Sequence, residues 1–160
     1  MTGRMKFVWV ALRLTMGWTF FWAFIDKLFG LGFATEPASA WVAGGSPTLG
    51  YLKFATAGPF APLFQAIAGN VFVDWLFMLG LGLIGLALLL GMGVQIAGWS
   101  GALMMAFMWL SNLPPANNPI VDDHIIYIFV LIGLATVKAG QWFGLGPWWS
   151  RKVKDYPLLV

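Results

Sequence analysis

Three ionisable side chains occur together directly before a long apolar run. Asp122, Asp123 and His124 stand in the stretch NNPIVDDHIIYIFVLIGLA, and His124 is the only histidine among the 160 residues. A carboxylate and an imidazole can exchange protons with a ligand when they lie within hydrogen-bonding reach of it. A second pair, Asp26 and Lys27, ends the first apolar run. These residue types indicate proton exchange as the chemistry available to the chain.

A structural interpretation of the carboxylates is also open. Aspartates in a first helical turn satisfy free N–H groups and favour the positive end of the helix dipole, by about 0.3 to 1 kcal/mol each. Capping is sufficient for Asp74 and Asp122, but one cap needs only one acceptor. Asp123 and His124 are therefore the candidate catalytic residues, together with Asp26, which would orient His124.

The elements that position these residues are predicted to be membrane helices. The chain is 60% hydrophobic and only 9% charged, which is too few charges to cover a soluble domain. Crossing about 30 Å of hydrocarbon takes roughly 20 helical residues. Four apolar stretches meet this length, near residues 7–29, 71–91, 94–112 and 121–142. We expect an all-α membrane protein, with residues 1–160 forming a single four-transmembrane-helix bundle.

The connection formed by residues 30–70 is too long for a simple turn. Within it, Phe60, Leu63, Phe64 and Ile67 recur at helical spacing, which predicts a short helix in the membrane interface. Lysine and arginine precede the first span and recur in the basic tail of residues 143–160. Both termini are therefore predicted on the cytoplasmic side of the plasma membrane, with the long loop on the outer side.

Side chains on the first helix are predicted to form a polar stripe. Thr15, Thr19, Trp22 and Asp26 share one helical face, and polar side chains in membrane helices usually face the protein interior. We expect this face to meet the start of the fourth span, which carries Tyr127. Trp22 and Tyr127 are then the aromatic candidates for packing on a bound ring.

A single arginine in the first span and a row of small residues in the second lead to two further predictions. Arg13 is expected to extend its guanidinium to the cytoplasmic headgroups, and the alternative is a buried partner for an anion or another subunit. On the second span, Gly80, Ala87 and Gly91 share a face of small side chains, which favours close approach of another backbone.

Composition excludes several kinds of cofactor and partner. The absence of cysteine removes disulfides, thiolate metal sites and iron–sulfur ligation, and a single histidine removes bis-histidine haem. We expect no metal site and no covalent or thiolate-bound cofactor, so a redox partner dissolved in the lipid, such as a quinone, is the candidate. The net charge of +3 is spread over separate segments, and nucleic acid is not an expected partner.

Four stretches of the chain resemble the DoxX/DoxD family of small four-helix membrane proteins. They are GWTFFWAFIDKLFGLGF, GGSPTLGYLKFATAGPFA, VDWLFMLGLGLIGLALLLGMG and NNPIVDDHIIYIFVLIGLA. The aspartate-lysine pair after the first helix and the aspartate-histidine pair before the fourth are the more specific parts. The resemblance implies a link to the quinone pool, and oxidation of thiosulfate together with a second small subunit.

Two functions from different classes are consistent with these features. In a quinone-reactive oxidoreductase subunit of the respiratory chain, Asp123 and His124 would donate protons, while Trp22 and Tyr127 would pack on the head group. Lys27 and Lys53 would attract a sulfur oxyanion. In the alternative, the chain is a non-catalytic accessory subunit that packs against a larger respiratory membrane complex. A small transporter is disfavoured, because the sequence has no inverted repeat.

Overall fold

The computed structural model describes residues 1–156 and 159, and the described part is helical. Its α-helices are α1 (Gly3–Phe29), α2 (Ala61–Ala66), α3 (Val71–Leu90), α4 (Val94–Ser111), α5 (Asp123–Thr136) and α6 (Gly146–Lys152). Three of them, α1, α3 and α4, are long and apolar enough to cross a membrane. The chain is therefore a membrane protein. Short helical turns at η1 (Pro37–Ser39), η2 (Trp41–Ala43), η3 (Tyr51–Ala55) and η4 (Ala139–Gln141) complete the described elements.

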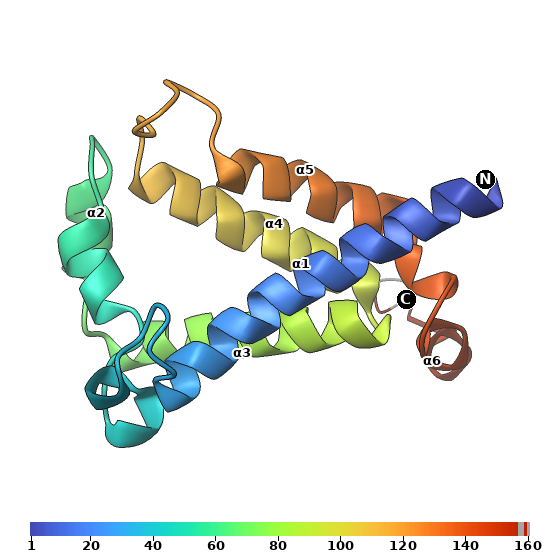
Figure 1. Ribbon diagram of the computed structural model, residues 1–160, viewed down its shortest axis with the longest axis horizontal. Helices are drawn as coiled ribbons and strands as arrows, with labels where there is room; N and C mark the ends of the chain where they lie inside the picture. Colours follow the sequence, from blue (N-terminus) through green and yellow to red (C-terminus); the bar gives the residue numbers. More distant parts are fainter. Residues whose placement is uncertain (157–158, 160) are drawn as a thin grey trace.

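The four longest helices pack side by side. α1 packs mainly on α3 and α5 packs mainly on α4, while further contacts join α3 to α4 and α1 to α5. Both chain termini lie at one end of this bundle (Figure 1). The opposite end, called the distal end below, carries α2, the loop before α5 and the connection between α1 and α3. The residues singled out before α5 and after α1 thus lie at the same end of the molecule.

Glycine allows α1 and α3 to approach closely. A Cβ atom at Gly85 would lie 2.6 Å from the backbone nitrogen of Phe21, so only a residue without a side chain fits there. Within the predicted face of small residues, Gly80 faces the Met104 side chain of α4 and Gly91 faces the Arg13 guanidinium, so the close approach to the α1 backbone occurs at Gly85, outside that face. The core between the helices is formed by side chains such as Met16, Phe20, Leu81, Leu88, Leu131 and Leu134.

The polar stripe predicted on α1 does not form. Thr15 and Thr19 are exposed, and their hydroxyls donate to the carbonyls of Ala11 and Thr15 at 2.9 and 3.0 Å. A threonine can satisfy its hydroxyl on the preceding turn of its own helix, so it needs no partner across a bundle. Shared polarity along one face was therefore an unreliable guide to the inward direction here.

Two boundaries differ from the predicted ones. α1 begins at Gly3 and is longer than predicted. α5 ends at Thr136, because Lys138 adopts a positive φ of 52° and the chain turns into η4 and then α6. α6 also shows that the basic tail is partly helical. In the long loop, α2 begins at Ala61, with proline in its first turn.

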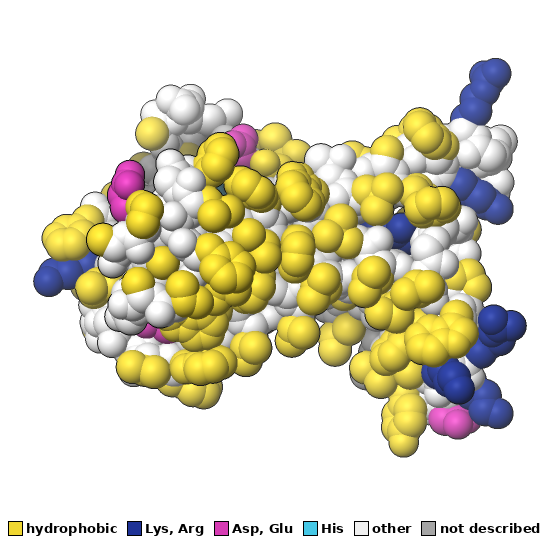
Figure 2. Space-filling view, turned by 60° about the horizontal axis from the view of Figure 1, so that its bottom comes forward, with side chains coloured by type: hydrophobic (Ala, Val, Ile, Leu, Met, Phe, Trp, Pro, Cys, Tyr) yellow, Lys and Arg dark blue, Asp and Glu magenta, His cyan; other side chains and the backbone are white. Residues whose placement is uncertain are grey.

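The surface is divided into zones along the bundle. On the face drawn in Figure 2, hydrophobic side chains cover the middle of the molecule, and most lysine and arginine side chains gather at the end with the termini. Acidic side chains lie mainly toward the distal end in the same view. An apolar band between a basic end and an acidic end is the pattern expected of a protein embedded in a bilayer.

Candidate functional site

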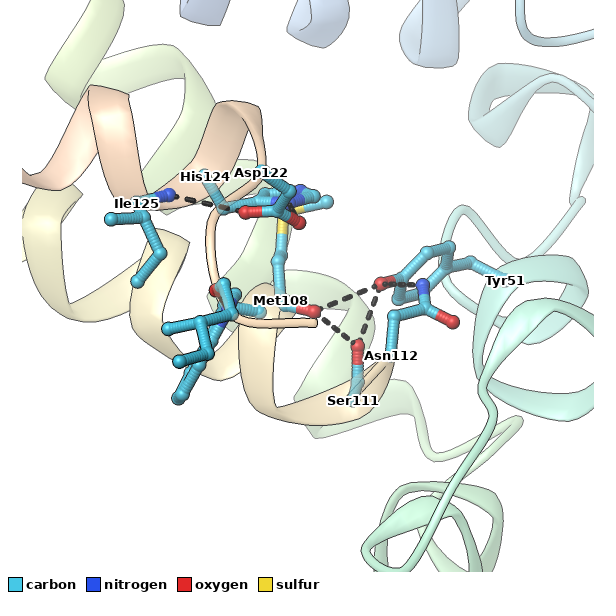
Figure 3. Close-up of polar contacts among 9 residues, drawn as sticks. Tyr51, Met108, Ser111, Asn112, Asp122, His124 and Ile125 are labelled. Carbon is cyan, nitrogen blue, oxygen red and sulfur yellow. Dashed lines mark hydrogen bonds and ion pairs between the residues drawn. The ribbon is translucent and has the colours of Figure 1, made fainter. Parts of the chain in front are cut away.

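The first turn of α5 holds a carboxylate–imidazole pair. Asp122 is the N-cap of α5, and its Oδ1 accepts from the Ile125 amide at 3.2 Å. Its Oδ2 lies 2.8 Å from His124 Nδ1 (Figure 3). The capping role predicted for Asp122 is confirmed. The expectation that Asp26 orients His124 is wrong, since the side chain two residues after an N-cap can reach back to the cap.

The surroundings of Asp122 favour its ionised form. Burial by itself raises the pKa of Asp122, but the hydrogen bonds from His124 and from the Ile125 amide outweigh burial and hold that pKa below its usual value. Asp122 is therefore a carboxylate that fixes the imidazole through Nδ1. Within the described residues, the second ring nitrogen, Nε2, makes no hydrogen bond, so the pair resembles the arrangements in which a carboxylate orients a histidine for proton transfer.

A cavity of about 500 Å³ lies beside this pair at the distal end. Asp122, Asp123 and His124 line it from the start of α5, and Asn112 lines it from the end of α4. The rest of the wall is Ala57, Val121 and residues 114–118. This volume falls within the range of roughly 300 to 1,000 Å³ typical of small-molecule sites. The structure thus brings Asp123 and His124 together at one polar cavity.

A hydrogen-bonded group next to the cavity joins the long loop to α4. The Tyr51 hydroxyl lies 2.6 Å from Ser111 Oγ and accepts from Asn112 Nδ2 at 3.1 Å. The Ala57 amide donates to the Ser111 carbonyl at 2.9 Å. Figure 3 shows this group beside Asp122 and His124, with Met108 between them. Sequence reasoning missed Tyr51 and Ser111, although polar side chains at the end of an apolar run were an available signal.

Asp26 belongs to a separate arrangement. Its side chain is 1% exposed and accepts from the amides of Phe33 and Ala34 at 3.3 and 3.0 Å, which closes the turn after α1. Trp22 packs edge-on against Phe33, with ring centroids 5.1 Å apart. Within the described residues, no hydrogen bond or ion pair connects Asp26 to Asp123 or His124, and neither Asp26 nor Trp22 lines the cavity.

Asp74 anchors the long loop to α3. The N-cap of α3 is Asn70, whose side chain accepts from the Phe72 amide, so Asp74 is not needed as a cap. Its Oδ1 instead accepts from Ser46 Oγ at 2.9 Å, the Thr48 amide at 3.2 Å and Thr48 Oγ1 at 2.5 Å. The capping expected for Asp74 is thus corrected to a tertiary role that orders the loop next to the cavity.

The remaining predicted site residues lie elsewhere. Lys53 is exposed, with its ammonium 5.5 Å from the centroid of the Phe54 ring. Lys27 is half-buried in the last turn of α1, and Tyr127 packs against the hydrophobic core. None of the three lines the cavity. The structure therefore supports a site made of the α5 start and the α4 end, without the aromatic and lysine residues expected around it.

Arg13 lies at the opposite end of the bundle and is fully buried. Its Nη1 donates to the carbonyls of Ala139 and Phe143 at 3.2 and 2.7 Å, while Nε and Nη2 have no partner within the described residues. A Cβ at Gly91, which has a φ of 78°, would lie 2.6 Å from Nη1. The expectation that Arg13 extends to the headgroups is wrong, because its guanidinium fastens α1 to the segment after α5.

Comparisons of the chain with protein-family models, with curated proteins and with solved structures find no match. Within the described residues, no three histidine, cysteine, aspartate or glutamate side chains come together as metal ligands would. The chemistry of the site therefore has to be inferred from its own geometry. A fixed imidazole, a neighbouring exposed carboxylate and an amide at one cavity can bind a polar ring and exchange protons with it.

Proposed function

We propose that the chain is a four-span protein of the plasma membrane with both termini in the cytoplasm. The three spans α1, α3 and α4 are complemented by α5, whose 14 residues cover about 21 Å at 1.5 Å per residue. The turns after α5 extend the segment toward the end with the termini. The gathering of lysine and arginine at that end supports the orientation, since such residues are enriched in cytoplasmic segments (Figure 2).

In this orientation the cavity opens on the outer side of the membrane, and the protein is a quinone-reactive subunit of a redox enzyme. The single observation that supports this function is the Asp122–His124 pair on the wall of a 500 Å³ polar cavity at the rim of the bundle. A quinone head group needs hydrogen-bonding groups near the interface, and its reduction consumes two electrons and two protons. The cavity supplies groups for the protons.

Each side chain has a definite part in this proposal. Asp122 accepts from Nδ1 of His124, so Nε2 can donate to a quinone oxygen when the ring is doubly protonated, as the imidazolium. Asp123 is exposed on the cavity wall and returns protons from solvent to the site. Asn112 donates a further hydrogen bond to the ring. The electrons come from a reductant through another subunit, and the DoxX/DoxD resemblance favours thiosulfate, for which no side chain is assigned.

The proposal is tested with the full chain in lipid nanodiscs. The affinity for a short-tailed benzoquinone is measured for the native chain and for His124→Gln, Asp122→Asn and Asp155→Asn. We expect His124→Gln and Asp122→Asn to weaken binding by about tenfold, which corresponds to the loss of one hydrogen bond to a charged or oriented partner. Asp155→Asn is the matched control, because Asp155 is exposed and belongs to the tail. Equal affinity in all four proteins would contradict the proposal.

A second candidate is a non-catalytic accessory subunit of a larger respiratory membrane complex. The observation that favours it is the use of Asp26 and Asp74, both almost fully buried, as anchors for loop backbone and hydroxyl groups. Such anchors order the outer surface of the protein, and this role requires no catalysis. For this function, His124→Gln would leave quinone turnover of the intact complex unchanged, whereas variants of Asp26 or Asp74 would lower copurification with the partner.

A further inference from the structure

The distal end carries an apolar groove in addition to the polar cavity. The groove has a volume of about 290 Å³. It is lined from α2 and its two caps by Phe60, Leu63, Phe64 and Ile67, and from α4 by Phe107 and Leu110. The α2 side is the apolar stripe that the sequence places at helical spacing. Leu63 and Phe107 are 69% and 52% exposed, so the groove is open to the surrounding lipid.

The groove and the cavity flank the same short crossing of two chain segments. The Ala57 amide donates to the Ser111 carbonyl, and Ala57 and Asn112 form a bridge that lines the cavity. Phe60 follows Ala57 by one turn, while Leu110 directly precedes Ser111, and both line the groove. Figure 1 shows α2 and the loop before α5 on either side of the α4 end. A polar compartment and an apolar compartment therefore meet at one place.

We infer that the groove between α2 and α4 binds the isoprenoid tail of a long-tailed membrane quinone whose head group occupies the adjoining polar cavity. This inference rests on the proposed function and names the class of quinone, one with a long apolar tail rather than a short water-soluble one. Continuity with the cavity selects this occupant over a phospholipid acyl chain. A diacyl lipid would bring a charged phosphate beside Asp122 and Asp123, whereas a neutral quinone ring would not.

Transfer of the tail from the lipid into the groove releases less free energy than transfer from water would, because the lipid around the tail is already hydrocarbon. The preference therefore comes from ordered contacts with the phenylalanine and leucine side chains. An asparagine at position 63 would place an amide against the tail without a partner, and a tryptophan would fill the groove. Because Leu63 is largely exposed, neither change disturbs packing inside the bundle.

The test compares two benzoquinones with the same head group, one with a long isoprenoid tail and one with a short alkyl tail. Their affinities are measured for the full chain in phosphatidylcholine nanodiscs and expressed as mole fractions in the lipid, so that partitioning cancels. The variants are Leu63→Asn and Leu63→Trp. The matched controls are Leu76→Asn and Leu76→Trp, because Leu76 is 63% exposed on α3 and lies outside the groove.

We expect the native chain to prefer the long-tailed quinone by about tenfold. Both Leu63 variants should lose this preference, both Leu76 variants should keep it, and the short-tailed quinone should bind all five proteins alike. A native chain without preference, or Leu63 variants that keep it, would overturn the tail site while leaving the head-group site intact. If the short-tailed quinone does not bind, or binds His124→Gln as well as the native chain, the proposed function itself fails, and the tail site fails with it.

Discussion

Removing the carboxylate of Asp74 should release the long loop from α3. Asp74 is 5% exposed, and its Oδ1 accepts three hydrogen bonds from Ser46 and Thr48. A hydrogen bond to a charged group contributes about 1.5 to 3 kcal/mol, and the three are not additive because they share one oxygen. We expect Asp74→Ala to lower the free energy of unfolding by about 3 kcal/mol, since the Thr48 amide and both hydroxyls lose their acceptor.

The assay is denaturant unfolding of the full chain in detergent micelles, combined with limited proteolysis of residues 30–70. Asp74→Asn keeps an acceptor oxygen of the same shape and should cost only about 1 kcal/mol. Glu36→Ala is the matched control, because Glu36 is an exposed carboxylate in the same loop, and its effect should stay within about 0.5 kcal/mol. If Asp74→Ala unfolds and is cleaved like Glu36→Ala, the anchoring role is refuted.

Three further predictions concern other parts of the molecule. The pKa of Asp122 is lowered in the folded chain, so the contribution of this carboxylate to stability is present above its unfolded pKa, near 4, and is lost as the pH falls through the lower folded pKa. When the free energy of unfolding is measured against pH, Asp122→Asn should lose this dependence. An unchanged pH profile would contradict the pairing of Asp122 with His124. Arg13→Lys should lower the free energy of unfolding by about 2 kcal/mol, because an ammonium does not present the same planar donors to the carbonyls of Ala139 and Phe143. Proteolysis of the segment after α5 should also become faster. If this segment is cleaved at the same rate in the variant and in the native chain, Arg13 does not hold it. Gly85→Ala should force α1 away from α3 and lower the free energy of unfolding by about 1 to 3 kcal/mol in the same assay. Gly3→Ala is the control and should be tolerated, because open space surrounds Gly3. Equal stability of the two variants would contradict the close approach of α1 and α3 at Gly85.

The length and composition of the apolar stretches were sufficient to predict a membrane protein and three of its membrane-spanning helices. The aspartate at position 122, interpreted as a cap, was sufficient to predict where α5 starts, and the span predicted from residue 121 agrees closely with the observed start at Asp123, because a cap acts on the amides directly following it. The end of α5 was not predictable in this way. Val137, Ala139 and Trp142 continue the apolar pattern after Thr136, whereas in the structure the positive φ at Lys138 turns the chain out of the helix.

Only part of the site could be predicted, because contacts between residues close in the sequence follow from local geometry, whereas contacts between distant segments do not. Asp122 and His124 are two residues apart, so their pairing depends on the geometry of one helical turn. The contact of Tyr51 with Ser111 joins segments 60 residues apart and depends on how the loop folds over α4. Asp26 was assigned to the wrong partner because hydrogen bonds to the nearby loop amides satisfy its carboxylate before α5 comes within reach.

The most direct measurement of the central claim is the position at which a quinone head group contacts the chain. The full chain in nanodiscs is photolabelled with a benzoquinone that carries a photoreactive group on its ring, and the labelled peptides are identified by mass spectrometry. The predicted result is labelling of residues 112–124 that an unlabelled quinone displaces and that His124→Gln strongly reduces at the same quinone concentration. Labelling concentrated around Trp22 and Asp26, or equal labelling of the native chain and His124→Gln, would contradict the assignment of the cavity as the quinone site.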